Sequence, residues 1–381
     1  HSSPTRRSSD LNNASFKACN LGQSSFRNAQ MERSHFDQCG ASGASFDMAL
    51  MTNVTFSTSN LNEASFVHAT LPHAKLHNLY LKATIFERSD LKDATFSHIG
   101  LHQTNFREAR LERVSFKNVR FNQTIFDKAH LDEADASTLS FESVSFQETI
   151  LRETKFPLAH FVDCHFRGAS CVKTQFAGAT FFDCKIPHAL LSQTNFSNCR
   201  FWFPDFTGST FSGSNLTDTT FKKAQLGQCR FEKVRMERMN FRDQVLQKIT
   251  FEECDLTNSF FQGATLRDIS FEKSQLGGTN FEGAILTRVR LHLAKLRGIS
   301  LRETQLAQIE APYTDFQGSD LQGAVFEHCN LQQANLQLIN GQMLVFKQCE
   351  LRGINLSGSK LAFAQFNQHA LSDCNFQRAD L

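Results

Sequence analysis

Residues 91–110 read LKDATFSHIGLHQTNFREAR, and this stretch contains the pattern that decides the fold. A large apolar residue recurs at every fifth position of it: Leu91, Phe96, Leu101 and Phe106. The same frame continues in both directions, from Leu11 to Leu381, without insertion or deletion. Of its 75 central positions, 35 are Phe and 31 are Leu. A repeat of five residues is therefore the organising feature of the chain.

A period of five fits neither regular element. On a helix the centres would advance by about 500° and spiral around the axis, and on a continuous strand an odd spacing would alternate their faces. The conflict disappears if the chain turns a corner within each repeat. The residue two places before each centre is mostly Ala, Ser, Thr, Cys, Val or Ile. We therefore expect this small residue and the centre, at numbers ending in 4, 9, 1 and 6, to point inward.

Gly and Pro test the corner independently. Thirteen of the 19 Gly lie two places after a centre, and four of the six Pro lie one place after. Pro followed by Gly is the preference of a type II turn, because Pro fixes φ near −65° and Gly accepts a positive φ. Two residue types that do not define the frame thus agree with it.

The segments CNL (19–21), SNL (59–61), CDL (254–256) and ADL (379–381) match the loose consensus A(D/N)LXX. In this the sequence resembles the pentapeptide-repeat proteins, over residues 11–381. The resemblance implies an all-β solenoid, a right-handed four-sided parallel β-helix of about 18–19 uninterrupted coils with one repeat per side. Residues 20 apart then lie above one another. We expect a single domain over 11–381, after a disordered or linker segment at 1–10.

Composition excludes several classes of protein. With 39 Phe among 381 residues the chain carries too many aromatic side chains for a disordered protein. A net charge of +2 does not favour direct nucleic-acid binding, and no apolar run approaches the ~20 residues that span a bilayer. Because the first residue is His1, we expect a segment of a longer protein; flanking domains or end-to-end association would cover the exposed coil ends.

The sequence carries no motif for catalysis, a cofactor or a small-molecule substrate: it has no Walker loop, GxGxxG, GxSxG or HExxH. All 11 Cys occupy inward positions, ten in the small-residue slot and Cys171 at a centre, which favours small core residues over metal ligands. His369 and Gln244 are polar anomalies in the small-residue slot. For His369 a metal site stays an alternative to a tolerated polar residue. The amide of Gln244, if buried, should bond the backbone of an adjacent coil.

Apolar side chains at outward positions mark candidate binding surfaces. Val162, Phe182 and Trp202 each come directly after a centre and are spaced 20 residues apart. Phe203 is the next residue after Trp202. We interpret these four as a patch that binds a protein, with local packing as the structural alternative. Met343 and Phe363 form a weaker pair. Segment 222–248 has a net charge of +5 and supplies further weak candidates: Lys222, Lys223, Arg235, Arg238 and Arg242.

Two functions compete. The first is a non-enzymatic scaffold for protein–protein interaction, as the rod domain of a larger bacterial protein of the effector type. The second, which the family resemblance implies, is a duplex-DNA mimic that binds type II topoisomerase (gyrase) and modulates it or protects it from quinolone-like poisons. The net charge of +2 favours the first. We expect a cytoplasmic location in bacteria, or secretion into a host cell if the protein is an effector. The sequence does not identify the partner.

Overall fold

The computed structural model describes residues 10–366 and 371–381. The contacts within the chain divide it into two compact units, unit 1 (His1–Leu191) and unit 2 (Ser192–Leu381). The predicted disordered segment 1–10 lies outside the described residues except for Asp10, and His369 lies outside them too. The prediction of a single domain over 11–381 stays a prediction.

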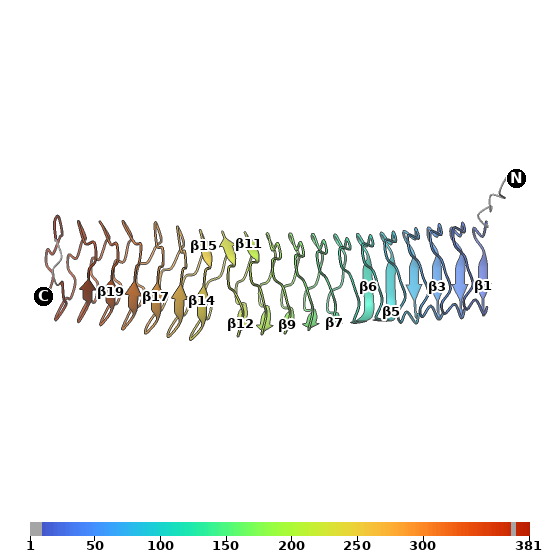
Figure 1. The fold of residues 1–381 in the computed structure, drawn as a ribbon, viewed down its shortest axis with the longest axis horizontal. Coiled ribbons are helices and arrows are strands. Elements are labelled where there is room, and N and C mark those ends of the chain that lie inside the picture. The colour runs from blue at the N-terminus through green and yellow to red at the C-terminus, as the bar shows by residue number, and fades with distance from the viewer. Residues whose placement is uncertain (1–9, 367–370) are drawn as a thin grey trace. The chain divides into compact units, whose positions relative to one another are not determined.

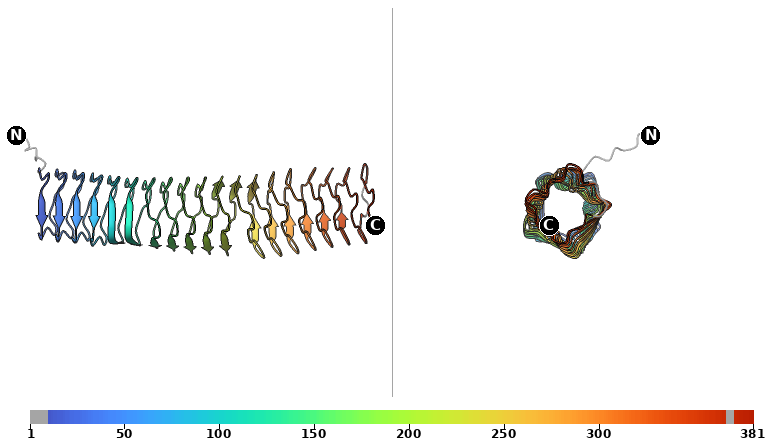
Figure 2. Two further views of the ribbon diagram at one scale, coloured as in Figure 1. Left: turned by 180° about the vertical axis from the view of Figure 1, so that it is seen from behind. Right: turned by 90° about the vertical axis from the view of Figure 1, so that its left-hand side faces the viewer.

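Unit 1 is a stack of coils whose parallel strands follow one another in chain order (Figures 1 and 2). The strands are β1 (Ser15–Lys17), β2 (His35–Asp37), β3 (Thr55–Ser57), β4 (Lys75–His77), β5 (Thr95–His102), β6 (Ser115–Asn122), β7 (Ser140–Glu142), β8 (His160–Val162) and β9 (Thr180–Phe182). Each residue pairs with the residue 20 positions later, as Phe16 does with Phe36. One coil therefore takes 20 residues, which is four repeats.

Unit 2 also pairs each residue with the residue 20 positions later, as Phe211 does with Phe231, and it has strands on more than one side of its coils (Figure 1). The strands are β10 (Arg200–Trp202), β11 (Thr210–Ser212), β12 (Thr220–Lys222), β13 (Arg230–Glu232), β14 (Val245–Gln247), β15 (Thr250–Glu252), β16 (Thr265–Arg267), β17 (Ile285–Thr287), β18 (Gln305–Ala307), β19 (Val325–Glu327) and β20 (Val345–Lys347). β10 pairs with β12, β11 with β13 and then β15, and β14 with β16 and so on to β20. The predicted four-sided parallel β-helix is confirmed.

Burial follows the predicted frame closely. From Ala29 to Phe346 every residue numbered with a final 1, 4, 6 or 9 is buried, except Ala224 and Gln244, which are half-buried. The rings stack in columns along the walls of each unit, as predicted: Phe36 lies 4.5 Å from Phe56, centroid to centroid, with an interplanar angle of 14°. Rings of neighbouring columns meet edge to face. Stacked and edge-on rings are the favoured aromatic geometries.

The corners have the predicted backbone. All thirteen Gly two places after a centre have a positive φ, between 63° and 72°. The sequence did not reveal that other residue types adopt the same left-handed conformation there, for example Leu158 at 57° and His68 at 58°. The amide of the corner residue donates to a carbonyl of the next coil, as His68 does to Glu87 at 3.1 Å. The stacking of coils thus holds residues in a conformation that side chains with a Cβ disfavour.

Candidate functional site

A ring and a group of cations lie side by side in unit 2. Trp202 ends β10 and pairs in register with Lys222, which ends β12. Phe203 turns the corner after Trp202, with φ of 56°, and its amide donates to the carbonyl of Lys222 at 2.9 Å. The ring of Phe203 is 41% exposed, and Nζ of Lys223 lies 5.4 Å from its centroid. This geometry is a cation–π contact at the protein surface.

Arg242 extends this surface by one coil. It follows Lys222 at a spacing of 20, and its guanidinium lies 4.2 Å from the centroid of the Phe260 ring. Its Nε also donates to Oε1 of Gln262 at 3.2 Å, so the side chain is held in place. We call Trp202, Phe203, Lys222, Lys223 and Arg242 the aromatic–basic surface.

The cations of this surface lack carboxylate partners, in contrast to most of their neighbours. Among the described residues, no ion pair within 4 Å involves Lys222, Lys223 or Arg242. Elsewhere in segment 222–248, Arg230 and Lys233 are paired with glutamates and Arg238 is paired with Asp218 at 3.3 Å. Among the described residues, no ion pair therefore neutralises the cations of the aromatic–basic surface.

The stacking of coils is interrupted beneath these cations. Within the part of the chain that the structure describes, no backbone hydrogen bond joins residues 220–226 to residues 240–245. The same corner is intact on both sides of this interval: Phe203 donates to Lys222, and Asp243 donates to Gln262 at 3.0 Å. The amides of Phe221, Lys223 and Leu226 thus lack the inter-coil acceptor that the fold provides elsewhere.

Gln244 explains the interruption. It occupies the inward slot between Ala224 and Ala264, which lie 20 residues before and after it, and its polar side chain is larger than the Ala, Ser or Thr that most other coils carry there. Both Ala224 and Gln244 are half-buried, although this slot is buried elsewhere from Ala29 to Phe346. Oε1 of Gln244 is buried and has no hydrogen-bond partner. The expectation that the amide bonds the adjacent backbone is wrong, because the coils separate around it instead.

A hollow of about 490 Å³ opens at this interruption. Its lining includes Lys222, Lys223, Arg242, Asp243, Gln244 and Val245. Three cations against one carboxylate make it positive, and the side chain of Val245, 76% exposed, adds an apolar edge. The hollow joins the aromatic–basic surface through the two lysines and Arg242. The hollow was not predicted from the sequence, although Gln244 is an anomalous residue of the small-residue slot there.

The predicted four-residue patch is divided between the units. Val162 and Phe182 belong to unit 1, where they end β8 and β9, pair in register, and are 43% and 48% exposed. Trp202, which is half-buried, and Phe203 belong to unit 2. Within unit 1 the apolar pair faces solvent as predicted, and in unit 2 the ring of Phe203 does so beside the cations.

The weaker candidates separate into different places. Met343 and Phe363 are exposed corner residues of successive coils, and the amide of Met343 donates to the carbonyl of Ala362 at 2.9 Å. Arg235 and Arg238 flank the centre Met236, on another side of the coil than Phe221. The structure therefore brings Lys222, Lys223 and Arg242 together but does not bring Arg235 and Arg238 to them.

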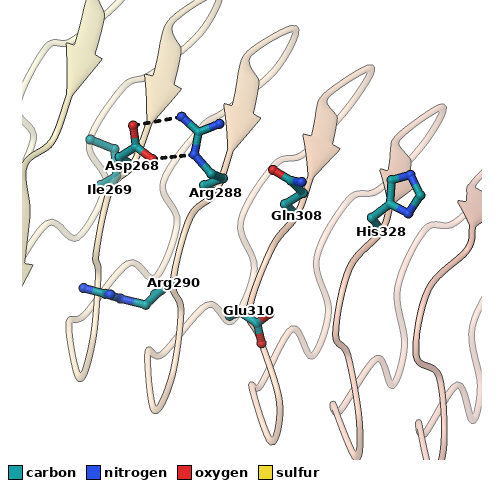
Figure 3. A pocket seen from close by; sticks show the side chains of 7 residues that line it. All are labelled: Asp268, Ile269, Arg288, Arg290, Gln308, Glu310 and His328. Atoms are coloured by element: carbon teal, nitrogen blue, oxygen red, sulfur yellow. Dashed lines mark hydrogen bonds and ion pairs between the residues drawn. The ribbon is translucent and has the colours of Figure 1, made fainter.

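Another hollow of unit 2, about 690 Å³, lies elsewhere and is electrically balanced (Figure 3). Arg288 donates two hydrogen bonds to Asp268, at 2.5 and 2.9 Å, and this guanidinium lowers the pKa of the Asp268 carboxyl. Arg290 pairs with Glu272 at 3.1 Å, and Glu310 accepts from Asn330 at 3.2 Å. Charges that satisfy one another offer little to a ligand, so we do not place the site here.

The cysteines resemble buried hydroxyl side chains in their contacts. The hydroxyl of Thr84 donates to the carbonyl of Leu61, 23 residues earlier, at 2.8 Å. The thiols of Cys254 and Cys329 likewise donate to the carbonyls 23 residues before them, those of Phe231 and Leu306, at 3.4 Å. No cysteine forms a disulfide. Among the described residues no group of three His, Cys, Asp or Glu side chains is placed to hold a metal ion. The described residues also include no helix long and apolar enough to cross a membrane.

Thiol reagents are expected to modify Cys349 in the native protein and to spare Cys171 and Cys254 until the chain unfolds. A hydrogen bond with Cys329 lowers the pKa of the half-buried Cys349, whereas burial raises the pKa of Cys171 and of Cys254 to about 12 from the ordinary 9.0. Above pH 9 the unfolded chain would release thiol protons that the native state keeps, so the free energy of unfolding should fall between pH 9 and 12. Mass spectrometry after brief iodoacetamide treatment checks the order of labelling. Early labelling of Cys254 would contradict it.

Comparisons with known proteins agree with the architecture. A family model described as a pentapeptide repeat region matches residues 9–86 and 204–281. A second, described as pentapeptide repeats in eight copies, matches residues 89–127, 159–198, 266–302, 299–337 and 345–381. Together the two models cover most of the chain. No curated protein sequence matches it.

Several solved structures are similar in fold at low identity. HetL, a pentapeptide repeat protein involved in heterocyst differentiation regulation from the cyanobacterium Nostoc sp., is 16% identical, with 58% of this chain and 88% of that chain covered and a TM-score of 0.26. A trypsin-treated form of QnrB1, a plasmid-mediated fluoroquinolone resistance protein, is 18% identical over 53% and 90%, with a TM-score of 0.28. Rfr23 from the cyanobacterium Cyanothece is 14% identical over 33% and 82%, with a TM-score of 0.18. Similarity at this level carries no argument about function.

Proposed function

The chain belongs to the pentapeptide-repeat family, and on this premise we propose that it is a non-enzymatic scaffold that binds a protein partner through the aromatic–basic surface of unit 2. The observation that carries the proposal is a set of three cations without an ion pair in the described chain, one of which, Lys223, lies against the exposed ring of Phe203. Lys222, Lys223 and Arg242 have no carboxylate partner in the described chain, and the ring of Phe203 leaves apolar area in water beside them. Aromatic and Arg side chains of this kind are enriched where proteins bind proteins.

The charge of the surface specifies the chemistry of the partner. Uncompensated cations attract carboxylates and repel other cations, and an exposed ring gains from burial against apolar side chains. The partner that fits is therefore an acidic protein segment with apolar residues next to its carboxylates. Whether Val162 and Phe182 of unit 1 also contact a partner stays a prediction, as do the origin in a larger bacterial protein and the cytoplasmic or secreted location.

The alternative function, a duplex-DNA mimic that binds gyrase, requires a surface that resembles a row of phosphates. The unpaired charges of the aromatic–basic surface are positive, which favours the scaffold over the mimic. A supercoiling assay separates the two: we expect gyrase to supercoil relaxed plasmid at the same rate with and without micromolar protein. Inhibition of supercoiling, or relief of quinolone-induced cleavage, would support the mimic.

Selection from a random peptide library tests the scaffold. With the protein as target and the variant Phe203→Ser, Lys222→Gln, Lys223→Gln as counter-target, we expect enrichment of peptides that combine Asp or Glu with aromatic or aliphatic residues. All three positions are exposed surface residues, so the variant should keep the fold. Enrichment of the same peptides on both proteins would contradict the proposal.

Trp202→Ala provides a single-residue test on the same surface. Because Trp202 lies at an outward position and is half-buried, we expect the thermal midpoint to change little. Affinity for the selected peptides should nevertheless fall, since a ring at a protein interface contributes about 1 kcal/mol or more. A loss of thermal stability that matches a core substitution would show that Trp202 serves the fold instead.

A further inference from the structure

We propose that the hollow between residues 220–226 and 240–245 is a binding pocket for one carboxylate of an acidic peptide segment. This inference deepens the proposed function and rests on it, because it specifies which group of the partner enters the chain and where. Three kinds of observation support it: the charge of the lining, the unpaired backbone groups, and the sequence that opens the coils.

The lining matches a carboxylate. Lys222, Lys223 and Arg242 surround the hollow with Asp243 as the single acidic residue, so one bound carboxylate would meet an excess of positive charge. The amides of Phe221 and Lys223 add donors that have no inter-coil acceptor. Charge-assisted hydrogen bonds of this type are shorter and stronger than neutral ones.

Gln244 distinguishes a peptide from an inorganic anion. Its Oε1 is buried without a partner, and an acceptor in that state needs an N–H or O–H group. A peptide brings a series of backbone N–H donors together with its carboxylates, whereas a phosphate dianion carries a single O–H donor and is otherwise an acceptor. The exposed side chain of Val245 and the ring of Phe203 provide apolar contacts beside the charged group. The lining therefore fits an acidic peptide better than free phosphate.

The opening is encoded by a single side chain. Ala224, Gln244 and Ala264 occupy the same inward slot of successive coils, and the coils that carry Gln244 and Ala264 are joined normally, by the bond from Phe241 to Phe260 at 2.7 Å. With alanine at position 244 three identical small residues would stack, and the missing bonds between 220–226 and 240–245 could form. Gln244→Ala should therefore close the pocket and raise the thermal midpoint, whereas most core substitutions lower it.

The experiment measures binding of an acetylated peptide of alternating glutamate and leucine, with the emission of the single Trp, Trp202, as the reporter. We expect saturable binding to the native chain, about a fivefold loss with Arg242→Gln, the size expected for one partly exposed charge pair, and about a tenfold loss or more with Gln244→Ala. Arg235→Gln is the matched control, because Arg235 likewise has no ion pair with any described residue but lies on another side of the coil. The control should bind like the native chain, and inorganic phosphate should not compete at equal concentration.

If the native chain binds the peptide, three results would still overturn the inference. Equal losses of peptide affinity with Arg235→Gln and Arg242→Gln would mean diffuse electrostatic attraction without a pocket. Full peptide affinity of Gln244→Ala would show that the hollow is not the binding pocket. Competition by inorganic phosphate would mean a general anion site. A stabilised Gln244→Ala variant with full peptide affinity would show that the peptide binds the aromatic–basic surface outside the hollow. The proposed function would then hold, and only the pocket would be refuted. If the native chain binds no acidic peptide at all, the proposed function fails with it.

Discussion

Phe231→Ala is expected to lower the free energy of unfolding of its part of unit 2 by about 3–5 kcal/mol, because a buried ring leaves both lost contacts and a cavity. Phe231 is fully buried, and its ring stacks between those of Phe211 and Phe251 at 4.6 and 5.0 Å. Small residues fill the remaining space of the column, so the site has little freedom to collapse. The loss should thus lie in the upper half of that range.

Solenoids open locally, so a single global midpoint can understate this effect. Hydrogen exchange of the amides in β11, β13 and β15 measures it where it occurs. Gln228→Asn is the control: Gln228 is an exposed corner residue with φ of 60°, a conformation that Asn tolerates. Equal losses in the two variants would overturn the inward and outward assignment of the frame.

Ala64→Asp is expected to have an effect of similar or greater size in unit 1. Ala64 is fully buried, and Ala44 and Thr84, which lie 20 residues before and after it, are fully buried as well. A carboxylate there would lose its water without gaining a partner, which costs several kcal/mol. Urea unfolding followed by circular dichroism measures the loss.

The pH dependence of this variant identifies the cause. Burial should raise the pKa of the new carboxyl above its unfolded value, so its cost is smallest when the group is protonated in both states and grows as pH rises through the unfolded pKa of about 3.9. Unfolding at pH 3 should therefore differ less from the parent than at pH 7. Glu63→Asp places the same residue type at the adjacent exposed corner and should change stability by less than about 0.5 kcal/mol. A variant that is as stable as Glu63→Asp at pH 7 would contradict the frame.

Most of the fold was predictable because one physical rule repeats. The centres and the small residues before them fill a core of fixed width, so Phe96 and Ala94 could be placed inward from their spacing alone. Gly at the corner, such as Gly213, correctly predicted a positive φ there. The left-handed corner at residues such as Leu158 was not predictable from residue type, since it is the hydrogen bonds between coils that hold it.

The candidate site was only partly predictable. The sequence marked Phe203, Lys222, Lys223 and Arg242 as candidates, but their grouping depends on which charges are neutralised across coils. Arg238 was also predicted as a candidate, but it forms an ion pair with Asp218. The two residues are 20 positions apart, so this pair could have been predicted from the sequence. The missing hydrogen bonds between residues 220–226 and 240–245 were not predictable. A Gln side chain in the inward slot can either bond the backbone of the adjacent coil or push that coil away, and the sequence does not distinguish these outcomes.

We propose that unit 2 carries an accessible and positively charged surface around its single Trp. Quenching of Trp202 fluorescence by iodide and by caesium tests it most directly, because the two ions differ in the sign of their charge. We expect iodide to quench the native emission more strongly than caesium does, and Lys222→Gln with Lys223→Gln to reduce the difference. A blue-shifted emission that neither iodide nor acrylamide quenches would place Trp202 against its own chain and would contradict the account.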